Sequence, residues 1–246
     1  TGRTCCRAGE MRRILTTAAM LAALIACRPG ASGAASQPGQ EKEPANEAAQ
    51  KVMDTISLIE EKLTETKYKH KIMVKLGKGI FHWDCSGMAD WVLKRSAPKA
   101  RKQLPGTRPL AKHFYRLIFK APVEGEKKGW QRLDGVRDVR PGDLFSWLTP
   151  DYWKNNPNTG HVGFVVSTPQ PHPLYENVWL MRVADASRYV HEDDSRIYGE
   201  GGGFGTGTMA FGCNDDGAPL AYGWFGSVQK PGAFLPVDMV FGRVTR

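Results

Sequence analysis

The chain has 246 residues with 34 basic and 25 acidic side chains, a net charge of +9. Residues 1–26 hold four of the basic and one of the acidic side chains, so 30 basic and 24 acidic remain after them, a net charge of +6. A moderate positive charge suits an anionic cell envelope at least as well as nucleic acid. Only Cys27, Cys85 and Cys213 follow residue 26, which is too few for a disulfide framework, and we do not expect a Cys85–Cys213 bond.

The first 27 residues have the layout of an export signal. Two arginines follow Met11, and residues 14–26 form an apolar, alanine-rich stretch that is too short to span a bilayer comfortably. Residues 24–27 (Leu-Ile-Ala-Cys) resemble the lipobox of bacterial lipoproteins, in which the cysteine is acylated. We therefore interpret 11–26 as a lipoprotein signal peptide and Cys27 as the lipidated residue; an ordinary signal peptide or an uncleaved anchor are the alternatives. We set residues 1–10 aside as a non-native upstream extension.

Composition divides the rest of the chain into a tether and a domain. Residues 27–46 are rich in Pro, Gly, Ala, Ser and Gln and cannot bury a core, so they are predicted to be a flexible tether. Residues 47–246 are enough for a single domain with its own core. Export argues against a nucleic-acid partner, and we expect a monomer held at the cell envelope. Because Arg28 rather than an aspartate follows Cys27, we expect the lipid to be in the outer membrane if the cell has one.

Hydrophobic periodicity predicts helices first and strands afterwards. Apolar residues at helical spacing indicate three helices, at about 48–66, 85–95 and 110–120. The later pattern is extended and predicts strands at 143–148, 161–167, 178–186 and 233–244. Because the helices precede the strands rather than alternating with them, the fold class is predicted to be α+β with an antiparallel sheet.

A cysteine opens the second predicted helix. Asp84 can cap this helix, which leaves Cys85 in the first turn, where free amides and the helix dipole favour the thiolate over the thiol. With a histidine to carry the proton, Cys85 becomes a candidate nucleophile. His82 is near in sequence and is a rival base, but we interpret it as a pocket wall because no strand-borne partner for it is evident.

A second histidine and an aspartate lie on neighbouring predicted strands. The turn-rich residues 168–177 indicate an antiparallel hairpin. If Thr168 pairs with Val178, His161 lies opposite Asp185 on the same face of the sheet. Asp185 could then orient one imidazole nitrogen and direct the other toward Cys85. A slip of one residue would separate the two side chains.

Four motifs occur in order: Asp-Cys-Ser-Gly at 84–87, Arg-Pro-Gly-Asp-Leu at 140–144, Gly-His-Val-Gly at 160–163 and Asp-Ala-Ser at 185–187. Over about residues 81–188 the chain resembles the NlpC-type family of papain-like cysteine peptidases, which cleave stem peptides of the bacterial cell wall. The resemblance implies a papain-like fold with a partial barrel, Cys85 as nucleophile, His161 as base and Asp185 as its orienting partner. It also implies peptidoglycan as substrate, with cleavage between D-glutamate and diaminopimelate through a thioester.

The chain also departs from this family. Asp185 stands where histidine is common, and the segment before Cys85 lacks the usual glycine-rich, tyrosine-containing stretch. We expect the substrate pocket to include four residues around Cys85, namely His82, Trp83, Asp84 and Ser86. A basic insertion at about 97–135 is interpreted as a solvated surface segment, with attraction to an anionic surface as the alternative.

The remaining reactive residues carry weaker signals. Residues 200–207 are glycine-rich but lack the Lys-Ser/Thr of a phosphate loop, so they are predicted to be a mobile connection, or a rim of the cleft. Cys213 is predicted to lie in a turn beside two acids, which would raise its pKa and make it a poor nucleophile. The other histidines show no metal-ligand spacing, and we expect neither metal nor other cofactor. Two functional alternatives remain: a thiol amidase or acyltransferase acting on another envelope substrate, and a catalytically silent envelope-binding lipoprotein.

Overall fold

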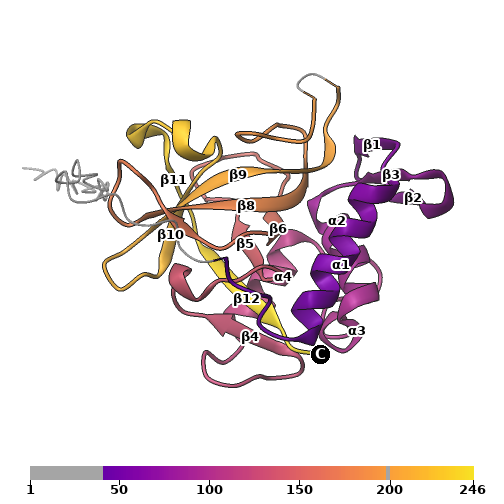
Figure 1. Cartoon of the computed structure of the whole chain (residues 1–246), viewed down its shortest axis with the longest axis horizontal. Helices are drawn as coiled ribbons and strands as arrows, with labels where there is room; N and C mark the ends of the chain where they lie inside the picture. Colours follow the sequence, from indigo (N-terminus) through magenta and orange to yellow (C-terminus); the bar gives the residue numbers. More distant parts are fainter. Residues whose placement is uncertain (1–40, 198–199) are drawn as a thin grey trace, which may run out of the picture.

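The computed structural model describes residues 41–197 and 200–246, and over these residues the protein has an α+β fold (Figure 1). The predicted signal peptide, lipidated Cys27 and most of the predicted tether lie outside the described residues. Within the described part of the chain, no helix is long and apolar enough to cross a membrane.

The helices lie in the first half of the chain, as predicted. They are α1 (Glu47–Lys62), α2 (Cys85–Ser96), α3 (Pro98–Arg101) and α4 (Ala111–Phe119). Asn46 caps α1 by accepting a hydrogen bond from the Ala49 amide at 2.9 Å. The predicted first helix is too long by about a turn, because Leu63 turns extended and the amides of Thr64 and Glu65 donate to the Gly79 carbonyl.

A small sheet that the sequence did not predict joins α1 to α2. Its strands are β1 (Glu65–Tyr68), β2 (Met73–Lys75) and β3 (Ile80–Trp83), in the order β1-β3-β2. These strands are only three or four residues long, so their alternation is too brief to identify from the sequence. The sheet buries Phe81 and Trp83 in the core and delivers the chain to the start of α2.

The large sheet has the order β11-β10-β9-β8-β6-β5-β12-β4, with β7 beside β8, and all of its pairs are antiparallel. Its strands are β4 (Trp130–Leu133), β5 (Leu144–Leu148), β6 (Gly160–Val165), β7 (Gln170–Pro171), β8 (Val178–Ser187), β9 (Gly203–Cys213), β10 (Pro219–Gly223), β11 (Leu235–Pro236) and β12 (Met239–Val244). Short 3₁₀ helices complete the described elements: η1 (Leu76–Lys78), η2 (Val136–Asp138), η3 (Gly226–Val228) and η4 (Pro231–Ala233). The strand order is open, with β11 and β4 at the edges, so the expected antiparallel sheet is present and is not closed into a barrel.

Alternating side chains give the large sheet two buried faces. On β5, Leu144 packs into a cluster with Met88 of α2 and Phe114 of α4, whereas Phe145 packs on the opposite face with Phe211 of β9. Helices α1, α2 and α4 cover the first face (Figure 1). This packing seats the start of α2 against β6 and β8, the strands that carry His161 and Asp185.

The structure differs from the sequence-based expectations in three places. The basic insertion is not merely solvated, because Phe114, Ile118 and Trp130 are fully buried in the core. The glycine-rich stretch is not a connection from residue 203 onward, because Gly203–Cys213 forms β9 and pairs with β8 along ten positions. The last predicted strand is divided into β11 and β12, because β11 pairs with β10 at one edge of the sheet whereas β12 pairs with β4 and β5.

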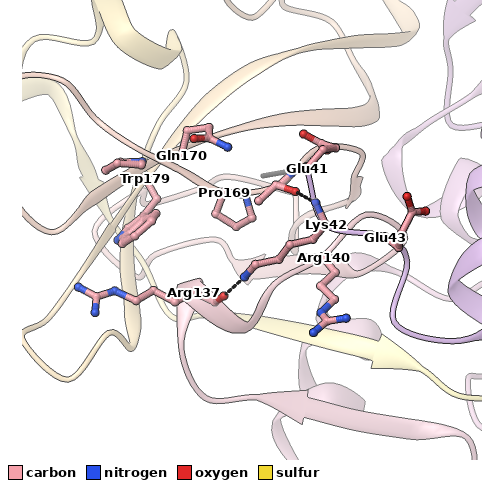
Figure 2. A pocket seen from close by; sticks show the side chains of 10 residues that line it. Glu41, Lys42, Glu43, Arg137, Arg140, Pro169, Gln170 and Trp179 are labelled. Atoms are coloured by element: carbon pink, nitrogen blue, oxygen red, sulfur yellow. Dashed lines mark hydrogen bonds between the residues drawn. The ribbon is translucent and has the colours of Figure 1, made fainter. Parts of the chain in front are cut away.

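The last residues of the predicted tether contact the domain. The Lys42 amide donates to Thr168 Oγ1, its Nζ donates to the Arg137 carbonyl at 2.7 Å, and Glu41 accepts from the Thr168 amide at 3.0 Å. Figure 2 shows Lys42 reaching across the wall of a cavity of about 640 Å³ that Arg137, Pro169 and Trp179 also line. Contact with the domain therefore begins before Glu47.

Candidate active site

Cys85 is the first residue of α2, directly after β3. Asp84 caps the helix: its Oδ1 accepts hydrogen bonds from the Gly87 amide at 2.8 Å and the Ser86 hydroxyl at 3.0 Å. Its Oδ2 accepts from His70 Nδ1 at 3.0 Å and from Arg108, which the basic insertion supplies. Burial alone would raise the pKa of Asp84, but the bonds from His70 and Gly87 and the Arg108 charge bring it below its ordinary value.

His161 on β6 hydrogen-bonds Asp185 on β8. His161 Nε2 lies 2.6 Å from Asp185 Oδ2, so the predicted association of these side chains is present. The predicted register is wrong by two residues, since Phe164 pairs with Ala184 rather than with Arg182. Thr168 does not pair with Val178, because the ladder is interrupted after Val165 and resumes at β7. A displacement of two keeps both side chains on one face, and His161 reaches Asp185 diagonally.

Cys85 and His161 are electrostatically paired. Burial lowers the pKa of His161, but the negative charge of the Cys85 thiolate and hydrogen bonds with Asp185 and Cys85 outweigh it, so the pKa rises to about 9. Since Asp185 occupies Nε2, Nδ1 is the ring nitrogen left for Cys85. The three groups thus form a chain from carboxylate to imidazole to thiol.

Asp185 is the centre of a buried ionic network that the sequence reasoning missed. Its Oδ2 also lies 3.1 Å from His191 Nε2, and its Oδ1 lies 2.8 Å from the Arg196 guanidinium. Arg196 also contacts both carboxylate oxygens of Asp194, at 2.9 and 2.7 Å. Burial would raise the pKa of Asp185, but Arg196, His191 and His161 hold it well below its ordinary value. Asp185 therefore presents a fixed negative charge to His161.

His191 meets acceptors on both sides of its ring. Nε2 faces the Asp185 carboxylate, and Nδ1 lies 3.2 Å from the Trp224 carbonyl oxygen. Neither partner can donate a proton, so both ring nitrogens of His191 face acceptors. This holds the ring in place against Asp185.

Glycines on β9 make room for this network. A Cβ at Gly205 would lie 2.6 Å from Arg196 Cγ, and one at Gly207 would lie 2.8 Å from His191 Cβ. Gly203, Gly205 and Gly207 alternate along one face of the strand. Glycine at every second strand position indicates a face approached closely by other groups, and this was the available signal for the missed residues.

A cavity of about 500 Å³ opens beside His161. Its walls are largely aromatic, with Trp147, Tyr222 and Trp224 among them; the Trp147 ring centroid lies 4.9 Å from that of His161. None of the four predicted pocket residues lines this cavity. His82 instead lies 2.7 Å from Glu65 Oε1, because β3 directs it toward β1, and Trp83 is fully buried.

The second described cysteine is separate from the site. Cys213 ends β9 instead of lying in a turn, and its Sγ donates to the Asn177 carbonyl at 3.2 Å. Its pKa is raised, mainly by burial. Cys85 and Cys213 are both free thiols. Among residues 41–197 and 200–246, no group of three His, Cys, Asp or Glu side chains is placed to hold a metal ion.

Comparison of the chain with protein-family models, curated proteins and solved structures gave no match. The geometry of the site is therefore the basis for assigning its chemistry. A thiol at a helix N-terminus, an imidazole beside it and a buried carboxylate holding the imidazole are the parts that nucleophilic acyl transfer requires.

Proposed function

We propose that this protein is a papain-like cysteine hydrolase that cleaves stem-peptide amide bonds of the bacterial cell wall, using Cys85, His161 and Asp185. The observation that carries the proposal is the position of His161, which interacts with Cys85 and lies 2.6 Å from a carboxylate that is fully buried. A structural histidine needs no such thiol partner.

The proposed mechanism begins with Cys85 as a thiolate and His161 as an imidazolium. The Cys85 thiolate attacks the amide carbonyl carbon and forms a carbon–sulfur bond, and the carbonyl oxygen becomes an oxyanion. In the first turn of α2 the Gly87 and Met88 amides are bonded to Asp84, which leaves the Cys85 and Ser86 amides as oxyanion donors. The His161 imidazolium then gives its proton to the leaving nitrogen as the carbon–nitrogen bond breaks, producing an amine and a thioester.

Hydrolysis of the thioester restores the enzyme. Neutral His161 takes a proton from water, and the resulting hydroxide attacks the thioester carbonyl carbon. The carbon–sulfur bond breaks, the carboxylic acid leaves, and the thiolate–imidazolium pair is restored. Asp185 stays ionised throughout, stabilising the imidazolium and fixing its orientation.

The substrate assignment rests on the sequence. The four ordered motifs resemble the NlpC-type family, whose usual cleavage is between D-glutamate and diaminopimelate. The export signal, the lipobox at Cys27 and the net charge of +6 after residue 26 favour an enzyme anchored by lipid at an anionic envelope.

The test is digestion of purified wall muropeptides by the full chain, read by mass spectrometry. We expect new stem-peptide fragments with the wild type and none with Cys85→Ala at an unchanged circular-dichroism spectrum. Cys213→Ala is the matched control and should retain activity, because Cys213 lies outside the site. Equal products from wild type and Cys85→Ala would contradict the proposal.

A second candidate is a thiol amidase or acyltransferase with another envelope substrate. One observation favours it: the cavity beside His161 is lined by none of the residues predicted to form the pocket around Cys85. In that case Cys85 would react with a thiol-directed electrophile at neutral pH, yet muropeptides would not be cleaved.

A further inference from the structure

The lining of the cavity beside His161 carries positive charge and no negative charge. Arg188 and His161 supply the positive charge, and none of the described residues that line the cavity is Asp or Glu. Burial raises the pKa of Tyr68 and Tyr222, so these hydroxyls stay neutral. Charge complementarity therefore favours a neutral or anionic occupant over a cationic one.

Aromatic rings form both the floor and the rim of this cavity. Trp147 and Tyr222 are stacked on its floor with centroids 4.2 Å apart. Trp153, Phe225 and Tyr189 lie at the rim and are 37%, 51% and 69% exposed. Open aromatic faces of this kind bind flat apolar surfaces, such as the C–H face of a sugar ring.

Neutral amides accompany the rings. The backbone N–H of Asn158 donates to Asn156 Oδ1 at 2.9 Å, and the backbone carbonyl of Asn158 accepts from the Thr149 hydroxyl. These two bonds order the turn. The Asn158 side-chain amide has no hydrogen-bond partner within the described part of the chain. A hydroxyl-bearing ligand could pair with it, whereas an acyl chain would remove it from water without compensation.

We propose that this cavity binds a sugar ring of the glycan strand, so that the enzyme acts on stem peptides still attached to their sugar. The ring face lies on the rim aromatics, its polar groups meet Asn156 and Asn158, and Arg188 faces the acidic groups of the ligand. This inference rests on the proposed function and names the form of the substrate.

The experiment compares two substrates with the same stem peptide, one linked to its disaccharide and one free. We expect kcat/KM of the full-length wild type to be about tenfold higher for the linked form, the size of effect that one or two aromatic contacts give. Phe225→Ala should reduce that preference about fivefold, because it removes one of the aromatic faces at the rim. Phe119→Ala is the matched control, since Phe119 is 53% exposed and lies on α4, outside the cavity.

The outcomes separate this inference from the proposed function. Equal kcat/KM for both substrates would overturn the sugar site while leaving the hydrolase intact. If neither substrate is cleaved, the proposed function fails. The sugar site is then tested separately by titrating Cys85→Ala with the disaccharide alone and measuring binding by tryptophan fluorescence. Saturable binding that Phe225→Ala weakens supports the site; absence of binding overturns it.

Discussion

At the scale of single residues, the proposed chemistry depends on the protonation state of His161. The Cys85 thiolate and Asp185 raise the pKa of His161 to about 9, so His161 is protonated and able to donate at neutral pH. As pH rises through about 9, the imidazolium is lost and the leaving amine has no acid. We therefore expect kcat/KM to fall on the alkaline side near pH 9.

Replacing Asp185 tests what causes the fall in kcat/KM at alkaline pH, the alkaline limb of the pH profile. In Asp185→Asn the carboxylate that favours the imidazolium is gone, so the alkaline limb should move to lower pH and kcat should fall about 100-fold or more. The pH profile of kcat/KM measures both effects. Asp215→Asn, an exposed acid outside the site, should change neither. An alkaline limb that stays in place in Asp185→Asn would show that Asp185 does not set the protonation of His161.

Arg196 is the residue on which the buried charges depend most. It pairs with both Asp185 and Asp194, and Arg196→Met would leave two buried carboxylates without this cation. We expect a loss of about 3–5 kcal/mol in the free energy of unfolding, because an unpaired buried charge is costly. Urea unfolding measures it. Arg116→Met, on the exposed side of α4, should change stability by less than about 0.5 kcal/mol.

At the scale of elements, β9 makes the buried network possible. A methyl group at Gly205 would press on Arg196, so Gly205→Ala should destabilise the protein by about 1–3 kcal/mol and lower kcat by displacing the support of Asp185. Gly212→Ala on the same strand is the matched control, because its nearest neighbour would be 3.6 Å away. Thermal unfolding and steady-state kinetics of the two variants check this. Equal effects of the two substitutions would argue against a specific role for Gly205.

The elements differ in how far the sequence could predict them. α2 and α4 were predictable from apolar residues at helical spacing, and β5, β6 and β8 from extended apolar runs between turn signals. β9 was not predictable, because its glycine-rich sequence is typical of a loop. These glycines leave space for Arg196 and His191, which come close to β9 only in the folded protein. The register of β6 with β8 was also mispredicted, because the connection after Val165 does not continue as a simple hairpin and pairing resumes only at β7.

At the scale of the whole molecule, the candidate site lies where two layers meet. Cys85 comes from the helical layer, and His161 and Asp185 come from the sheet, so packing of α2 on β6 and β8 aligns the three side chains. The sequence predicted this triad from motif order and alternation. It could not predict the aromatic cavity or the charged residues around Asp185. Those residues lie in distant segments, and no sequence motif fixes their distance along the chain from Cys85.

The most direct test of the central claim is to trap the thioester. The full chain is mixed with a stem peptide, quenched in acid within milliseconds to seconds, digested and mapped by mass spectrometry. We predict that the acyl fragment of the substrate is attached to Cys85, that hydroxylamine removes it, and that it is absent from His161→Ala. Product formation with no adduct on Cys85 at any quench time, and with Cys85→Ala still active, would contradict the account.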